Sequence, residues 1–121
     1  MENVPAEQKI QSIKSFQSTI RKTEKALAQM TQKGADTTLI KKRLKAFYIG
    51  LAVLEYAWNQ KPHDYTQAEL AEARSVLIAL FPSIENVYAK SKPGSPQRTL
   101  LERRLKALEL AVQALDILSN E

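Results

Sequence analysis

The chain has 121 residues, of which 44% are hydrophobic and 26% charged, a composition typical of folded globular proteins rather than disordered ones. It has no cysteine, which excludes disulfides, thiolate nucleophiles and cysteine-bound zinc, and no apolar run of about 18 residues that would span a membrane. The N-terminal residues lack the apolar core of a signal peptide, so we expect an intracellular, cytoplasmic protein.

The net charge of +5 is distributed unevenly along the chain. Residues 1–60 contain ten Lys or Arg and five Asp or Glu, whereas residues 61–121 contain eight of each. Between Lys9 and Lys45, ten basic residues are accompanied by only two acidic ones. The first half of the chain is therefore basic and the second half is balanced.

Two segments of the chain resemble each other. Thr38–Leu54 and Thr99–Leu115 are sixty-one residues apart and identical at seven of seventeen positions, and most other differences conserve the character of the residue. Such self-similarity indicates one structural unit used twice.

Apolar residues recur every three or four positions in four segments, the spacing of one face of a helix. The first segment starts near Pro5 and ends at about Gln32, before Gly34, and the second runs from Asp36–Thr38 to about Gln60. The predicted core-facing stripe of the second, from Ile40 to Leu54, repeats sixty-one residues later from Leu101 to Leu115.

Capping signals mark the two later helices. Thr66 and Glu69 have the spacing of a capping box at the start of the third, and Ser95-Pro96 gives an N-cap and a first-turn proline to the fourth. Pro82 interrupts the third helix and is expected to kink it or to split it.

The predicted fold is all-α: an up-down four-helix bundle of two repeated helical hairpins, about 5–60 and 66–119, in a single domain, 1–121, with the third helix kinked at Pro82. The simpler arrangement is that the four helices of one chain complete the bundle. The alternative is that the chain pairs with another copy to complete it.

Few residues suggest catalysis. His63 is the only histidine and lies in a predicted loop beside Pro62, where we expect it to be exposed; with Asp64 it is the sole basis for a hydrolase or metal-enzyme hypothesis. No pattern indicates a metal site, a phosphate-binding loop, a cofactor or a small-molecule substrate. We therefore predict a protein that is not an enzyme.

Basic residues of the first two helices form a candidate surface for nucleic acid or another anionic surface. A solvated helix face that keeps the bundle soluble is the alternative interpretation. The candidate residues are Lys14, Arg21, Lys22, Lys25, Lys41, Lys42 and Lys45.

A candidate protein interface lies on the second helix. Its positions outside the core-facing stripe are more apolar than those of the fourth helix, at Tyr48, Ala52 and Tyr56. A helix that is apolar nearly all round is either buried deepest in the monomer or in contact with a partner, most simply another copy.

The segment Leu54–His63, which follows a Lys- and Leu-rich helix, and the segment Ile84–Tyr88 resemble the N-terminal helical region of Gag-like proteins of insect LTR retroelements. This resemblance implies a structural protein that self-associates and tolerates RNA nearby. Bacterial or phage four-helix proteins fit the composition as well.

The leading functional hypothesis is a non-enzymatic helical module for protein interaction or assembly, which self-associates or binds another protein. The alternative is binding of nucleic acid or an anionic surface through the basic face of the first two helices.

Overall fold

A computed structural model describes residues 1 and 3–120, and these residues form an all-α four-helix bundle without strands. The helices are α1 (Ala6–Gln32), α2 (Thr38–Asn59), α3 (Gln67–Lys90) and α4 (Pro96–Ser119). Residues 2 and 121, which the predicted domain includes, lie outside the described residues. The predicted fold class and the four predicted helices are confirmed.

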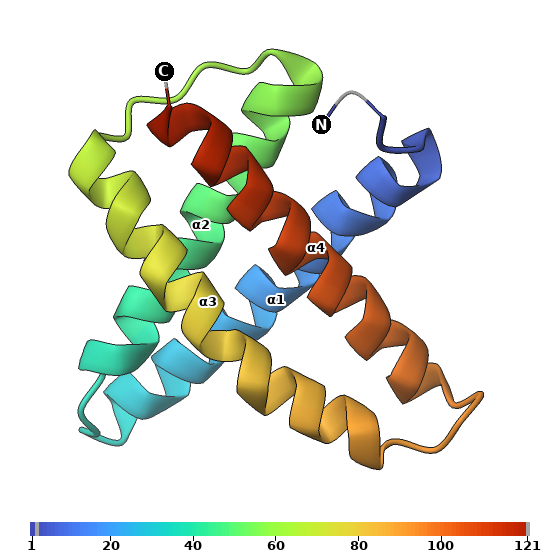
Figure 1. The fold of residues 1–121 in the computed structure, drawn as a ribbon. Helices are drawn as coiled ribbons and strands as arrows, with labels where there is room; N and C mark the ends of the chain where they lie inside the picture. Colours follow the sequence, from blue (N-terminus) through green and yellow to red (C-terminus); the bar gives the residue numbers. More distant parts are fainter. Residues whose placement is uncertain (2, 121) are drawn as a thin grey trace.

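The two hairpins, α1–α2 and α3–α4, pack across each other and diverge toward their connecting loops (Figure 1). α4 packs against α1, and α3 packs against α2. α2 and α4 also pack against each other, whereas the backbones of α1 and α3 do not approach each other closely within the described part of the chain. The two helices that contain the repeated sequence are thus the central pair of the bundle.

The helix ends follow the local signals in the sequence. Gly34 has a φ of 72°, and the N–H groups of Gly34 and Ala35 donate to the carbonyls of Thr31 and Met30, which makes a Schellman end for α1. Thr66 and Glu69 form the predicted capping box of α3. The Ser95 hydroxyl accepts from the Arg98 N–H at 3.1 Å and caps α4.

Pro82 does not split α3, which continues through it to Lys90. The proline has no N–H for the carbonyl four residues earlier, so one backbone hydrogen bond is missing inside the helix. The interruption is tolerated because Leu77, one turn before it, is fully buried and holds this part of α3 against the core. The kink at Pro82 stays a prediction.

The buried residues of α2 and α4 follow the same sixty-one-residue repeat as the sequence. They cover a wider face of each helix than the predicted core-facing stripe. Positions sixty-one residues apart on α2 and α4 are buried in both helices. They are Ala46, Phe47, Ile49, Gly50, Val53 and Leu54 on α2, and Ala107, Leu108, Leu110, Ala111, Ala114 and Leu115 on α4. Several of these side chains are small, which allows the two central helices to approach closely.

The offset of sixty-one residues also relates α1 to α3, although their amino-acid sequences differ. α1 begins at Ala6 and α3 begins sixty-one residues later at Gln67. Phe16, 2% exposed, corresponds to Leu77, which is fully buried. Val87, near the C-terminal end of α3, is exposed because the hairpins diverge toward their loops.

Gly50 lies at the centre of the packing. A Cβ atom there would lie 2.6 Å from Cε1 of Phe16 and 3.5 Å from Cδ1 of Leu77. The absent side chain leaves the space that the Phe16 ring occupies. In the second hairpin the corresponding residues are Ala111 and Leu77, a larger residue on the central helix and a smaller one on the outer helix.

Within the described residues, no helix has an apolar segment long enough to cross a lipid bilayer.

Candidate functional site

A groove runs between α1 and α4, with a volume of ≈ 880 Å³. We call it the α1–α4 groove. Its walls come from the first two-thirds of α1 and from the first two turns of α4. The lining residues that carry charge are Glu7, Lys14, Arg21, Lys22, Arg103 and Arg104.

The α1–α4 groove is strongly basic. Five of its lining residues are cationic and one, Glu7, is acidic. None of the five cations forms an ion pair with another described residue. The charge of this groove is therefore available to a ligand.

The neutral residues of the groove add donors for hydrogen bonds. Ser15, Ser18 and Gln17 line it together with Gln11, whose amide nitrogen donates to Glu7 at 3.3 Å. No aromatic residue is among its lining residues.

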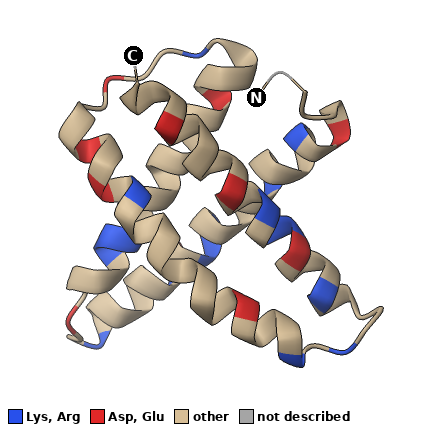
Figure 2. Cartoon of the chain, viewed as in Figure 1, with Lys and Arg blue, Asp and Glu red and all other residues tan. Residues whose placement is uncertain are grey.

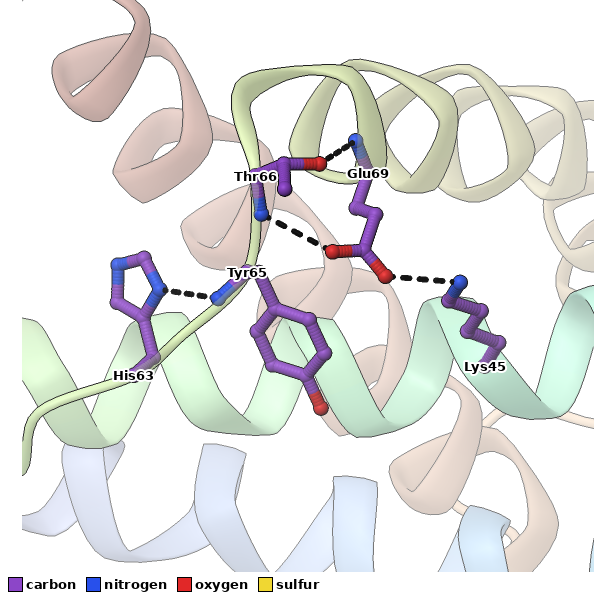
Figure 3. Close-up of polar contacts among 5 residues, drawn as sticks. All are labelled: Lys45, His63, Tyr65, Thr66 and Glu69. Carbon is purple, nitrogen blue, oxygen red and sulfur yellow. Dashed lines mark hydrogen bonds and ion pairs between the residues drawn. The ribbon is translucent and has the colours of Figure 1, made fainter.

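The contact between α2 and α3, which we call the α2–α3 seam, has the opposite electrostatic character. Lys42 and Lys45 on α2 line a small depression with Glu69 and Glu72 on α3. The Lys45 ammonium lies 2.9 Å from the Glu69 carboxylate (Figure 3). Figure 2 shows the acidic residues at the start of α3, on the side of the bundle where α2 lies.

Glu69 is fixed by several contacts. It accepts from the Thr66 N–H at 3.0 Å while its own N–H donates to the Thr66 hydroxyl, and its second oxygen pairs with Lys45 (Figure 3). The Thr66 N–H and then Lys45 lower the pKa of the Glu69 carboxyl. The same pair raises the pKa of Lys45. Of the two lysines of the seam, Lys45 is thus neutralised by an ion pair, and Lys42 lines the same depression as Glu69 and Glu72.

The groove and the seam occupy equivalent places in the duplicated fold, since one joins α1 to α4 and the other joins α3 to α2. Arg103 corresponds to Lys42 at an offset of sixty-one residues. The acidic residues Glu69 and Glu72 correspond to Gln8 and Gln11 of α1. At these two positions α3 therefore has carboxylates near the lysines of α2, whereas α1 has neutral amides, of which Gln11 lines the groove with the arginines of α4.

The seven basic residues predicted as a nucleic-acid surface do not lie together. Lys14, Arg21 and Lys22 line the α1–α4 groove. Lys42 and Lys45 line the α2–α3 seam. Lys25 and Lys41 are exposed and line neither. The seven residues therefore lie at two helix contacts and at other exposed positions, and their binding of nucleic acid stays a prediction.

Sequence reasoning missed Arg103 and Arg104. They lie in the half of the chain whose summed charge is zero, and nothing in the sequence states that α4 packs beside α1. The available signal was the repeat itself, because Arg104 is one of its seven identical positions and Arg103 replaces a lysine.

The predicted interface residues share one side of α2 but have different surroundings. Tyr48 is 39% exposed and its hydroxyl donates to the Glu24 carboxylate of α1, which raises the pKa of the tyrosine. Ala52 is half-buried. Tyr56 is 39% exposed and lines a second groove, between the C-terminal halves of α2 and α4, with Ile117.

The apolar character of α2 has an explanation within the monomer. α2 contacts α1, α3 and α4, so apolar residues are needed on three of its sides. α4 likewise contacts the other three helices, so these contacts explain the apolar core faces of both central helices and do not decide between the two interpretations of α2. The interface at Tyr48, Ala52 and Tyr56 stays a prediction.

His63 lies in the connection between α2 and α3 as expected, but it is half-buried rather than exposed. Its Nδ1 accepts from the Tyr65 N–H at 3.2 Å (Figure 3). Its ring also meets that of Tyr56 edge-on, at 5.2 Å between centroids. These contacts hold the histidine ring against the loop and the end of α2. The neighbouring Asp64 is exposed. Among the described residues no three His, Asp or Glu side chains cluster as metal ligands do.

No protein family, curated protein or solved structure matches this chain. The resemblance to Gag-like proteins of LTR retroelements stays a prediction.

Proposed function

We propose that this protein is a non-enzymatic binding module whose ligand is the phosphate backbone of nucleic acid and whose binding surface is the α1–α4 groove. The observation that carries the proposal is the set of five cations in this groove without protein ion-pair partners, at the place where the duplicated fold carries a neutralised seam on its other side.

The shape of the site favours a rod-like polyanion. A groove bordered by two helices surrounds a strand or a duplex edge on two sides, whereas a membrane surface is flat and meets only the rims. Arginine, lysine, serine and glutamine are the side chains that commonly contact phosphates and sugars. Each neutralised phosphate releases counterions, so binding through such a groove depends steeply on salt.

The composition of the groove favours recognition of the backbone over the bases. Stacking on aromatic side chains is the usual way in which single-stranded bases are held, and no aromatic residue lines the groove. We therefore expect weak dependence on nucleotide sequence.

The test is fluorescence anisotropy with a labelled single-stranded RNA across a salt series. We expect a slope of log K against log salt of about −2.8 to −3.5, since each of four or five phosphate contacts adds about −0.7. Arg21→Glu with Arg103→Glu should lower the affinity about 100-fold at low salt and reduce the slope by about 1.4.

Lys25→Glu with Lys41→Glu is the matched control, because it changes the net charge equally at exposed positions outside the groove. Equal losses in the two variants would mean that net charge rather than the groove attracts RNA, and would contradict the proposal. Preferential binding to anionic lipid vesicles over RNA at equal salt would contradict it too.

Self-association is the second candidate function. It is favoured by two exposed apolar residues at repeat-equivalent positions, Tyr56 and Ile117, 39% and 48% exposed, in the groove of ≈ 780 Å³ between α2 and α4. Light scattering of a Tyr56→Ser, Ile117→Ser protein should give a lower mass than the parent. A parent that is already monomeric would remove this candidate.

A further inference from the structure

A second pocket, of ≈ 340 Å³, lies among all four helices and shares Ser15, Lys22 and Arg104 with the α1–α4 groove. It is formed by the halves of the helices nearest the two hairpin loops, where the hairpins diverge (Figure 1). The space exists because the backbones of α1 and α3 stay apart from each other, while α2 and α4 pack together. Its volume falls within the range of about 300–1,000 Å³ that is usual for small-molecule sites.

The walls of this pocket are apolar. Phe16, Phe47 and Leu108 are buried core residues, and α3 adds Leu80 and Ile84. The neutral polar residues are Ser15, Thr19 and Thr23 of α1, and the hydroxyl proton of Thr23 is already donated to the Thr19 carbonyl at 2.7 Å. An apolar chain inside would replace water from these walls and be favoured by their burial.

The charged residues of the pocket are all cationic. Lys22, Arg43 and Arg104 line it from three different helices, and no carboxylate does. Lys22 and Arg43 are exposed and Arg104 is half-buried, which places the charges toward solvent. None of them forms an ion pair with another described residue. Arg43 and Arg104 occupy equivalent, identical positions of the repeat.

We propose that this pocket binds a medium-chain fatty acid, with the acyl chain among Phe16, Phe47, Leu80 and Leu108 and the carboxylate at Arg43 and Arg104. The combination of an apolar interior with an unopposed cationic opening matches a single-chain amphiphile with an anionic head. A neutral apolar ligand leaves the cations unused, and a polyanion has no polar partners inside. The competing explanation is that the methylene stems of the three cations cover the apolar walls themselves.

The proposal goes beyond nucleic-acid binding and does not depend on it. The test is isothermal titration calorimetry with dodecanoate below its micellar concentration, alongside dodecyltrimethylammonium, which has the same chain and the opposite charge. We expect saturable binding of one dodecanoate per chain, at least tenfold tighter than the ammonium compound. Absence of saturable binding, or equal affinity for the two amphiphiles, would overturn the proposal.

Two arginine variants separate this pocket from the α1–α4 groove. Arg43 lines the pocket alone and Arg103 lines the groove alone. Arg43→Gln should weaken dodecanoate binding about tenfold, the loss of one charge-assisted hydrogen bond, and leave RNA binding unchanged. Arg103→Gln should do the reverse. Dodecanoate binding that falls only with Arg103→Gln would place the ligand in the groove and overturn the assignment.

Larger side chains on the α1 wall of the pocket test whether the acyl chain lies inside it. Thr19→Leu with Thr23→Ile introduces the residue types found at the equivalent positions of α3, Leu80 and Ile84. The chain length that binds best should shorten, from dodecanoate toward octanoate, in a protein that retains its helical circular dichroism. Methyl NMR signals of Leu80 and Ile84 should shift with the ligand in the parent. An unchanged optimum together with shifts at Ile10 and Leu100 of the neighbouring groove would contradict the site.

Discussion

The α1–α4 groove and the α2–α3 seam are built on the same register of a duplicated hairpin, yet one is charged and open while the other is neutralised. In the seam, Lys45 pairs with Glu69 at 2.9 Å. In the groove, five cations face a single carboxylate. The difference comes from the outer helices. α3 has Glu69 and Glu72 where α1 has Gln8 and Gln11, and it has no basic residue at the positions equivalent to Lys14, Arg21 and Lys22.

This contrast shows how a duplicated fold separates stability from function. The central helices α2 and α4 bury the same six positions, so the core constrains both copies alike. The outer helices α1 and α3 share few letters, so their surfaces are free to differ. A binding site can then arise on one side of the molecule while the equivalent place on the other side remains structural.

The largest effect is expected from transferring the acidic pattern of α3 to α1. Gln8→Glu with Gln11→Glu gives α1 the carboxylates that α3 carries, and should lower RNA affinity by about 10- to 100-fold at low salt, because the groove cations gain internal partners. Gln29→Glu with Gln32→Glu, at the same spacing on exposed positions of α1, is the control. Unchanged binding in the first variant would mean that the groove cations do not contact RNA.

The converse change makes the seam resemble the groove. Glu69→Gln with Glu72→Gln removes the ion-pair partner of Lys45 and both carboxylates that line the seam with Lys42, and should create measurable binding of RNA at low salt through α2 and α3. Both variants are compared by anisotropy with the same oligonucleotide. A loss of affinity on removal of these acids would contradict an electrostatic origin of binding.

The packing of the core can be tested at Gly50 and Phe16, whose equivalents in the second hairpin are Ala111 and Leu77. Gly50→Ala should lower the free energy of unfolding by about 1–2 kcal/mol, because overpacking against Phe16 outweighs the gain of about 0.5–1 kcal/mol from alanine in a helix. Adding Phe16→Leu reproduces the combination of Leu77 and Ala111 and should recover about 1 kcal/mol relative to the sum of the single changes. Urea unfolding followed by circular dichroism measures both, and strict additivity would mean that the two residues do not compete for space.

The helix caps offer a smaller effect. Thr66→Ala should cost about 1 kcal/mol of unfolding free energy because it removes the hydroxyl that accepts from the Glu69 N–H. Thr31→Ala is the matched control, since that hydroxyl only donates to a carbonyl within its own helix. Equal changes in the two variants, measured by thermal unfolding, would indicate that the capping box adds nothing.

The smallest effect concerns acid pH. The backbone N–H and then the hydroxyl of Thr38 lower the pKa of Asp36, and Thr66 and Lys45 lower that of Glu69. A carboxyl with a lowered pKa stabilises the fold above its unfolded pKa, and this contribution is lost as the pH falls through the folded pKa. The urea midpoint should therefore decline below about pH 4.5, the ordinary value for glutamate, and Asp36→Asn should reduce the decline. An equal decline in this variant would assign the acid sensitivity to other groups.

Local features of the fold could be predicted from the sequence because they depend on residues close together in the chain. The 3–4 spacing gave the helices, Gly34 the end of α1, and Thr66 with Glu69 the start of α3. The wider buried face of α2 and α4 was harder to predict from the sequence. Ala46 and Gly50 of α2 and the equivalent Ala107 and Ala111 of α4 are small residues, which add little to an apolar pattern. Continuity through Pro82 depends on tertiary contacts that outweigh one lost hydrogen bond.

The candidate site could be predicted only in part because it joins segments about eighty residues apart. Short loops fix which helices are neighbours within a hairpin, but not that α4 packs on α1. The charge distribution along the chain therefore led us to place Lys14 and Lys42 on one surface, although they lie at different helix contacts. It gave no indication of Arg103. For the same reason His63 was expected in solvent, although Tyr56 and Tyr65 enclose it.

The most direct measurement is NMR mapping of a single-stranded RNA onto the ¹⁵N-labelled protein at low salt. Our account predicts that the amide shifts change along α1 from Ile10 to Lys22 and at the start of α4 from Leu100 to Arg104, and that the changes vanish as salt is added. Shifts concentrated on the α2–α3 seam, or none at low salt, would contradict the claim that the α1–α4 groove is the binding surface.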